Sequence, residues 1–186
     1  MEEIQAGQEV GKDSSGQVNH KEKPPKSTSV RIFCRNEKGH ILLVLERPHD
    51  VILPNRKVFT KSWGWSLPGG RLKRRADGRP KETPEHAIDR ELRQEAKYRV
   101  GRKDRIETIS DKEENHDIIF FEGRDAYPCK TTQEEPDIAD EQWFDPKIIF
   151  GSAESPLHVE LFSQKLGKSF PVYRRHVNWI QGVFKK

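Results

Sequence analysis

The sequence predicts an α/β domain, in which short strands and a few helices share one hydrophobic core. Two apolar runs of strand length, residues 29–36 and 40–47, open the folded part of the chain. A third strand-like run, residues 63–67, ends just before a glycine pair, Gly69 and Gly70. Segments with helical spacing of apolar residues come after that pair and at residues 171–184. Strands before and between helical segments indicate an α/β fold.

The N-terminal segment differs from the rest of the chain. The 186 residues suit one domain with room for a tail, and a charged fraction of 34% against a hydrophobic fraction of 32% indicates that part of the chain is solvated. Residues 1–27 lack apolar periodicity and cannot bury enough surface to offset chain entropy. We therefore expect a disordered tail over residues 1–27 and a folded domain over residues 28–186.

Composition excludes several classes of protein. The sequence has no secretory signal and no apolar stretch long enough to span a bilayer, so we expect no membrane partner. Two cysteines, Cys34 and Cys129, fit reduced thiols better than a disulfide scaffold, which favours a cytoplasmic location. The net charge of +4 suits an anionic ligand, but such an excess is also common on surfaces that bind nothing.

The first elements follow from alternation and turn residues. Residues 29–36 alternate as a half-buried strand does, residues 40–47 form a second apolar run, and the turn at residues 36–39 joins them, so we predict a hairpin. Residues 48–61 contain prolines and no clear period, which predicts a long loop. Strand character returns at residues 63–67 and stops at the glycine pair.

A helix is predicted to begin at Pro84. Thr83 suits the N-cap, Pro84 suits the first helical position, and Ile88 and Leu92 form an apolar stripe at i, i+4 spacing. Further strands are predicted over residues 105–109, 117–122 and 142–144.

The last segment, residues 171–184, has one apolar side at helical spacing. That side comprises Val172, His176, Trp179, Ile180 and Val183. We expect a helix that packs on the core, with the rings of His176 and Trp179 in structural positions.

The helix at Pro84 carries the candidate chemistry. Glu91, Gln94 and Glu95 share one of its faces, because residues three and four apart lie together on a helix. Mg²⁺ prefers oxygen ligands of this kind, completed by water and substrate phosphate. A solvated face of charged residues would have the same spacing. The preceding Gly69 and Gly70 favour a site, since glycines let the main chain approach a ligand closely.

Residues 69–98, which read GGRLKRRADGRPKETPEHAIDRELRQEAKY, resemble the signature of the Nudix hydrolase family. That signature is Gly-x5-Glu-x7-Arg-Glu-hydrophobic-x-Glu-Glu-x-Gly. The matching positions are Glu82, Arg90, Glu91, Leu92 and Glu95. The resemblance extends over about residues 28–186, and it implies the family's α/β/α sandwich with a central mixed sheet.

The resemblance implies a hydrolase that uses Mg²⁺ or Mn²⁺ to cleave a pyrophosphate bond in a nucleoside diphosphate linked to another moiety, by attack of water on phosphorus. Glu91 would be a metal ligand or the base that acts on water, and Arg90 would orient it. Glu95 and the Gly70 carbonyl would be further metal ligands. Glu82 would pair with Arg90 and brace the loop against the helix.

Other site positions are less regular. Gln94 stands where the family has one of two adjacent glutamates, and its amide would be a weaker, uncharged metal ligand. In many members a later loop supplies a fourth acidic ligand; Glu135 and Asp137 are the candidates here, although such an acidic loop is also commonly just solvated. Arg47 and Arg71 are candidate phosphate-binding residues.

Two further departures concern the chain path. Lys97 stands where the family has a helix-ending glycine, so Gly101 would end the helix about one turn later. Eleven residues separate Gly70 from Glu82 in place of five, and this longer loop, residues 71–81, holds six basic residues and one acidic residue. It either reaches substrate phosphates or is a solvated loop.

Two functions remain open from the sequence. The first is the metal-dependent hydrolase with a small nucleotide-type substrate. The alternative is a catalytically weak or inactive Nudix-fold module that binds a nucleotide or nucleic acid. Gln94 favours the alternative, whereas the retained arginine and three glutamates of the motif favour the enzyme. Nucleic acid is not favoured as a partner, because the basic loop and tail lack the interleaved aromatic residues of a stacking surface.

Overall fold

The computed structural model describes residues 26–52, 58–111, 115–131, 133, 135–150 and 159–184. The tail predicted over residues 1–27 falls outside them, apart from its last two residues. None of the described helices is long and apolar enough to cross a membrane.

The strands in these described ranges form two three-stranded sheets and two ribbons. The first sheet has the order β1 (Ser27–Cys34), β7 (His116–Pro128), β6 (Tyr98–Asp111), with β1 parallel and β6 antiparallel to β7. The second is antiparallel, with the order β5 (Gly64–Ser66), β2 (Ile41–Glu46), β8 (Ile138–Phe144). The ribbons are β3 (His49–Ile52) with β4 (Val58–Lys61), and β9 (Glu160–Ser163) with β10 (Lys168–Pro171). The strands predicted over residues 105–109, 117–122 and 142–144 lie within β6, β7 and β8.

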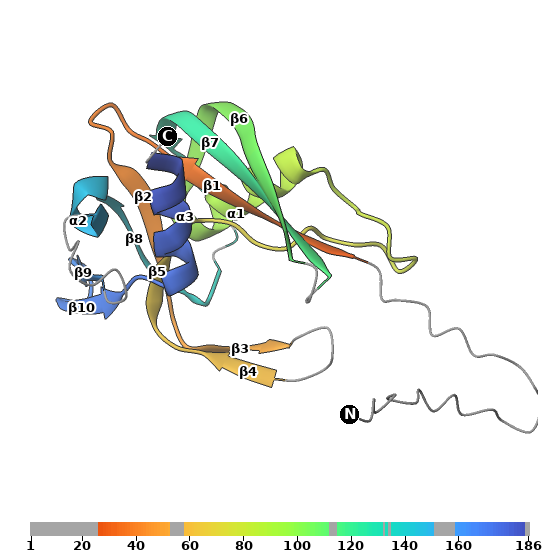
Figure 1. The fold of residues 1–186 in the computed structure, drawn as a ribbon, viewed down its shortest axis with the longest axis horizontal. Helices are drawn as coiled ribbons and strands as arrows, with labels where there is room; N and C mark the ends of the chain where they lie inside the picture. Colours follow the sequence, from red (N-terminus) through yellow and green to blue (C-terminus); the bar gives the residue numbers. More distant parts are fainter. Residues whose placement is uncertain are drawn as a thin grey trace, which may run out of the picture.

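Three helices complete the described part of the chain: α1 (Pro84–Ala96), α2 (Pro146–Phe150) and α3 (Arg174–Phe184). The two longer helices lie on opposite sides of the strands (Figure 1). Alternation along the strands explains this arrangement. Val30 and Ile32 of β1 pack with Leu92 of α1, whereas Phe33 of the same strand packs with Ile180 of α3. The predicted α/β/α sandwich with a mixed sheet is confirmed.

The predicted hairpin between the first two strands is wrong. Apart from a single bridge between Arg35 and Ile41, β1 and β2 pair with other strands. One edge of β1 carries β7. The other edge carries residues 68–72, because the Val30 N–H donates to the Gly70 carbonyl at 2.9 Å. The glycine segment therefore takes the place that the second strand of a hairpin would occupy.

The long loop predicted over residues 48–61 is also wrong, since β3 and β4 form a ribbon there. Figure 1 shows this ribbon projecting from the body of the molecule. Its apolar side chains Ile52 and Phe59 are 65% and 58% exposed. A ribbon without a buried face has no hydrophobic period, so the residues of these two strands show no pattern that predicts a strand.

The helix ends at Ala96, so the prediction that Gly101 would end it one turn later is wrong. Lys97 itself adopts the left-handed conformation, with φ of 58°, and its N–H donates to the Leu92 carbonyl. This conformation costs a residue with a side chain about 1 kcal/mol or more. The pairing of Tyr98 with Pro128 opens the β6–β7 ladder directly afterwards, so the chain has to turn at this point.

Two structural expectations for the rest of the chain are confirmed. His176 is buried on α3, where its Nδ1 accepts the Leu67 N–H at 2.8 Å, and Trp179 packs on Phe120 with ring centroids 5.0 Å apart. The helix begins at Arg174, later than residue 171, because β10 pairs with β9 up to that point. Both cysteines are free thiols.

Candidate active site

Local sequence fixes where α1 begins and which face it shows to the sheets. Thr83 is the N-cap, its Oγ1 accepting the His86 N–H at 3.2 Å, and Pro84 occupies the first turn as predicted. Ile88 and Leu92 are fully buried against the first sheet. This anchoring turns the adjoining face of the helix, which carries Glu91, toward the glycine pair.

Arg90 braces the helix against the loop that precedes it. Its Nε donates to Glu82 Oε2 at 3.1 Å and its Nη2 donates to Glu82 Oε1 at 2.7 Å. Glu82 also accepts the Lys73 N–H at 2.8 Å, and Nη2 of Arg90 reaches the Arg71 carbonyl at 3.2 Å. The hydrogen bonds from Arg90 lower the pKa of Glu82, so this carboxylate stays ionised as a fixed partner.

The longer loop, residues 71–81, has internal backbone order. The Arg75 N–H donates to the Arg79 carbonyl at 2.8 Å, and the Lys81 N–H donates to the Lys73 carbonyl at 2.7 Å. The loop is therefore a closed turn.

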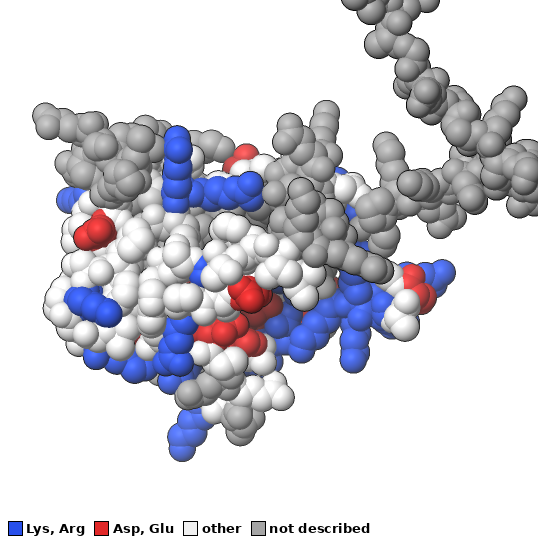
Figure 2. Space-filling view, turned by 90° about the horizontal axis from the view of Figure 1, so that it is seen from below, with Lys and Arg blue, Asp and Glu red and all other residues white. Residues whose placement is uncertain are grey.

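Figure 2 shows acidic side chains gathered near the middle of one face of the molecule, with lysine and arginine side chains beside them.

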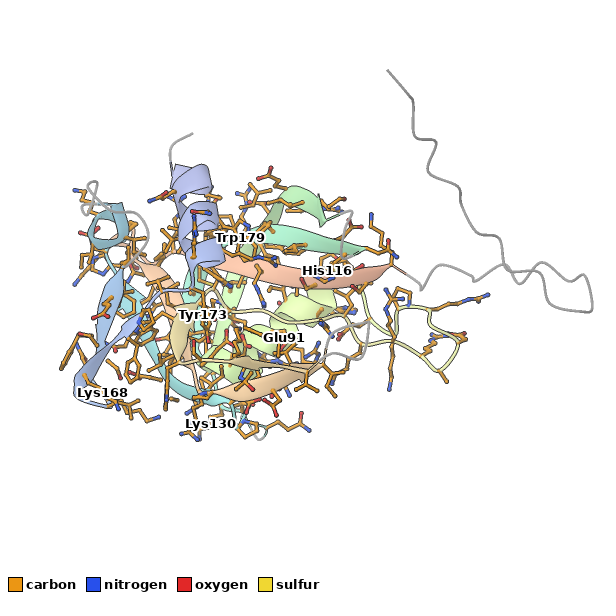
Figure 3. The ribbon with its side chains drawn as sticks, turned by 60° about the horizontal axis from the view of Figure 1, so that its bottom comes forward. Glu91, His116, Lys130, Lys168, Tyr173 and Trp179 are labelled. Carbon is orange, nitrogen blue, oxygen red and sulfur yellow. The ribbon has the colours of Figure 1, made fainter. Side chains whose placement is uncertain are left out.

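The glycine pair contacts the two carboxylates directly. The Gly69 N–H donates to Glu95 Oε2 at 2.7 Å. A Cβ on Gly70 would lie 2.2 Å from Glu91 Oε1, and a Cβ on Gly69, whose φ is 143°, would lie 2.1 Å from the Val30 carbonyl oxygen. Glycine is required at position 69, because its φ is positive and the backbone of β1 lies against it. At position 70 a side chain would instead displace the carboxylate of Glu91. In Figure 3, Glu91 lies among side chains in the middle of the molecule, away from its rim.

Glu91 and Glu95 lie four residues apart on α1, and the charge of Glu91 acts on Glu95. Glu91 is 6% exposed and accepts a hydrogen bond from Arg90 Nη1 at 2.7 Å. Burial nevertheless raises the pKa of Glu91, and burial together with the charge of Glu91 raises the pKa of Glu95 well above its usual range. Two ionised carboxylates so placed repel each other, and a cation between them would relieve the repulsion.

The oxygen ligands available for a metal are few but of the right type. Within the described residues, no three His, Cys, Asp or Glu side chains are grouped as a metal cage. The third predicted ligand, the Gly70 carbonyl, accepts the Val30 N–H and keeps one lone pair for another partner. This set fits Mg²⁺, which commonly takes one or two carboxylates and completes its octahedron with water and substrate phosphate.

Gln94 and Glu135 lie next to the carboxylate pair. Gln94 accepts from Arg90 Nη1 at 3.3 Å and donates to Gln133 Oε1 at 3.1 Å. The Glu135 N–H donates to the Gln94 carbonyl at 3.5 Å, and the charge of Glu135 raises the pKa of Glu91 further. The loop before β8 thus lies against the helix face that carries the candidate ligands.

Three other predicted residues lie further out. Asp137 is exposed, and its backbone carbonyl accepts the Arg47 N–H at 2.6 Å. Arg47 is exposed and donates from Nη1 to the Pro136 carbonyl at 3.3 Å. The side chain of Arg71 is exposed too, and its contribution to the site is the carbonyl that Arg90 contacts.

Sequence reasoning missed two charged residues beside the site, Arg31 and Glu46. Arg31 lies on β1 and its charge lowers the pKa of both Glu91 and Glu95. Glu46 ends the fully buried strand β2, is 8% exposed, and pairs with Lys61 and with the Ser66 hydroxyl. The sequence does carry a signal for both residues, since each is a charged residue inside an apolar run. Strand alternation alone, however, places the Arg31 side chain on a face that would be exposed to solvent.

Comparison with known proteins gives one family and one fold. A family model described as the NUDIX domain matches residues 25–162. No curated protein sequence matches the chain.

Solved structures provide the other comparison. The crystal structure of an ADP compounds hydrolase has 16% identity and a TM-score of 0.58, covering 92% of this chain and 80% of that one. The NUDIX domain of Shewanella oneidensis NrtR, complexed with ADP ribose, has 14% identity and a TM-score of 0.56, covering 92% and 94%. A MutT protein from Methanosarcina mazei Go1 has 18% identity and a TM-score of 0.52, covering 87% and 97%. At these identities the similarity shows the fold.

Proposed function

Because this chain belongs to the Nudix hydrolase family, we propose that it is a Mg²⁺- or Mn²⁺-dependent pyrophosphohydrolase acting on a nucleoside diphosphate linked to another moiety. The observation that carries the proposal is the carboxylate pair of the buried Glu91 and the half-buried Glu95, which faces Gly69 and Gly70. Two similar structures, one of an ADP compounds hydrolase and one of a NUDIX domain complexed with ADP ribose, support a nucleotide-type substrate.

In this proposal each residue has a defined task. Glu91, Glu95 and the Gly70 carbonyl hold the metal, with Gln94 and Glu135 at its periphery; Asp137 remains the other candidate for the acidic ligand. The bound metal supplies Lewis acidity toward the phosphoryl oxygens and lowers the pKa of coordinated water.

Glu91 accepts the proton of the attacking water. Carboxylates are among the side chains that act as general bases. Arg90 fixes the position of Glu91 through the 2.7 Å hydrogen bond. Attack on one phosphorus breaks the anhydride bond and releases a nucleoside monophosphate and a second phosphorylated product.

A binding module without turnover is the second candidate, and one observation favours it. Gln94 presents a neutral amide where a carboxylate would strengthen the metal site, and this amide is already engaged by Arg90 and Gln133. The cytoplasmic location expected from the sequence stays a prediction.

The test is a turnover screen of the full chain on a panel of nucleoside diphosphate derivatives, including ADP-ribose, and nucleoside triphosphates. Each compound is incubated with Mg²⁺, with Mn²⁺ or with EDTA, and the products are separated by chromatography. The hydrolase predicts metal-dependent release of a nucleoside monophosphate from at least one diphosphate derivative. A chain that binds panel members in calorimetry and cleaves none of them is the binding module.

A further inference from the structure

Arg31 has a side chain whose hydrogen-bonding capacity is largely unused. It lies in the middle of β1 and is partly buried. Its Nε is buried and has no hydrogen-bond partner among the described residues. The contact from its Nη1 to the Val30 carbonyl is long, at 3.5 Å. An arginine presents five donors in a planar fork, and leaving a buried donor unpaired is unfavourable.

The backbone places this residue next to the glycine pair. A Cβ on Gly69 would lie 3.0 Å from the Arg31 Cα, so the two segments touch. Gly69 in turn donates to Glu95, and Gly70 lies against Glu91. Arg31 therefore lies beside the glycine pair, which itself contacts the carboxylates that would hold the metal.

Alternation along β1 sets the direction of the side chain. Val30 and Ile32 belong to the hydrophobic cluster under α1, whereas Phe33 belongs to the cluster under α3. Arg31, which alternates with the first two, is on the α3 side of the strand. Its charge also lowers the pKa of the buried His176 on α3, in agreement with this direction.

Among the described residues, the charge of Arg31 lowers the pKa of four groups: Glu46, Glu91, Glu95 and His176. Three are carboxylates, yet none forms a described ion pair with Arg31. Glu46 is already bound to Lys61 and Ser66, and Glu91 to Arg90. The guanidinium is thus held among acidic groups that have other partners.

We propose that Arg31 is a substrate-binding residue, whose guanidinium takes a phosphate oxygen of the diphosphate group from the α3 side while Glu91 and Glu95 hold the metal beside Gly70. The inference rests on the proposed function for the identity of the anion. A planar fork with a free Nε matches a tetrahedral phosphate, which accepts two parallel N–H donors. Such binding would satisfy the unpaired donor and neutralise charge on the oxygen opposite the metal.

The experiment measures binding of methylenediphosphonate, a diphosphate that cannot be hydrolysed, to the full chain by calorimetry with Mg²⁺ present. Wild type is compared with Arg31→Met and Arg31→Lys. Arg35→Met is the matched control, because Arg35 directly follows β1 and its guanidinium faces Glu122, with Nε 3.0 Å from that carboxylate. Thermal unfolding of each variant reports its fold.

Arg31→Met is expected to raise the Kd about tenfold or more, and Arg35→Met to change it less than twofold. Arg31→Lys, which keeps the charge but loses the fork, is expected to raise the Kd several-fold. If Arg31 were only a counter-charge for the carboxylates, the lysine variant would bind as wild type does, and that result overturns the inference. Wild-type affinity in Arg31→Met overturns it as well, and so does a wild type that does not bind the diphosphonate.

Two outcomes distinguish the role of Arg31 in binding from the proposed hydrolase activity. A chain that binds the diphosphonate through Arg31 but hydrolyses no nucleotide leaves the inference standing and removes the hydrolase. If the chain hydrolyses a nucleotide but binds the diphosphonate equally with or without Arg31, the hydrolase activity stands and the role of Arg31 in binding is overturned.

Discussion

Arg90 holds Glu82 with two hydrogen bonds, from Nε to Oε2 at 3.1 Å and from Nη2 to Oε1 at 2.7 Å. The two side chains are only 15% and 13% exposed. The same guanidinium also donates from Nη1 to Glu91 at 2.7 Å. One arginine therefore joins the end of the basic loop to the helix and fixes the carboxylate proposed as the base.

Removing the charge from this pair should weaken the fold. Glu82→Gln is expected to lower the free energy of unfolding by about 1–3 kcal/mol, because Arg90 loses a charge-assisted, forked partner at a largely buried position. Urea denaturation measures the change. The matched control is Asp77→Asn, whose partner Arg79 lies 4.0 Å away with both side chains exposed, so the change should stay within about 0.5 kcal/mol. Equal effects in the two variants would contradict the brace.

The two glycines should respond differently to alanine. Gly69→Ala places a methyl group 2.1 Å from the Val30 carbonyl oxygen at a φ of 143°, and both neighbours are backbone, so we expect a loss of several kcal/mol of stability. Gly70→Ala meets the end of the Glu91 side chain instead. We expect it to keep most of the stability and to lose most of the turnover, because the carboxylate is displaced. Denaturation and kinetics of both variants separate these effects, and a fully active Gly70→Ala would contradict the site.

The carboxylate pair should make stability depend on pH and on metal. The folded pKa values of Glu91 and Glu95 are raised, so above the ordinary glutamate pKa of about 4.3 the folded state binds more protons than the unfolded state. Their contribution to stability therefore falls as pH rises from that value through the raised values. Mg²⁺ binds the ionised pair, so the increase in Tm that it causes should grow with pH.

Melting curves at several pH values, with Mg²⁺ or EDTA, check this dependence. Glu95→Gln serves as the comparison, since it removes one of the coupled carboxylates and should flatten both trends. A Mg²⁺ effect that shrinks as pH rises, or that is unchanged in Glu95→Gln, would contradict the assignment of the pair.

Local signals in the sequence predicted the start of the helix and the face that Glu91 and Glu95 share. The start of α1 depends on Thr83 and Pro84, and the placement of Glu91 and Glu95 depends on helical spacing, so both are encoded within a few residues. The left-handed Lys97 was missed, because the need to turn there comes from the β6–β7 ladder and not from the residue itself.

Pairings between distant segments were harder to predict. The partner of β1 is β7, almost ninety residues later, and the glycine segment on the other edge of β1 reads as a simple strand end in the sequence. Arg31 was missed for the same reason. Strand alternation shows that it lies opposite Val30, but only the packing of α3 and the glycine pair shows that its face is not solvent.

Restoring an acidic residue at position 94 should strengthen the metal site. Gln94→Glu adds a charged oxygen ligand beside Glu91, at the loss of the hydrogen bond to Gln133, so the Mg²⁺ concentration for half-maximal activity should fall several-fold with turnover preserved or raised. Activity titrations with Mg²⁺ measure this. Gln181→Glu on α3 adds the same charge away from the site and should leave the titration unchanged. A higher Mg²⁺ requirement in Gln94→Glu would contradict the proposed ligand position.

Turnover by Glu91→Gln tests the central claim most directly. The substitution keeps the size of the side chain and removes the proposed base and metal ligand, so kcat on the best substrate of the panel should fall by about 10²–10⁴-fold at saturating Mg²⁺. Asp89→Asn is the matched control on the same helix, because Asp89 pairs with Lys103 and is partly exposed; it should retain activity near that of wild type. Equal activity in wild type and Glu91→Gln, with both proteins folded, would contradict the account.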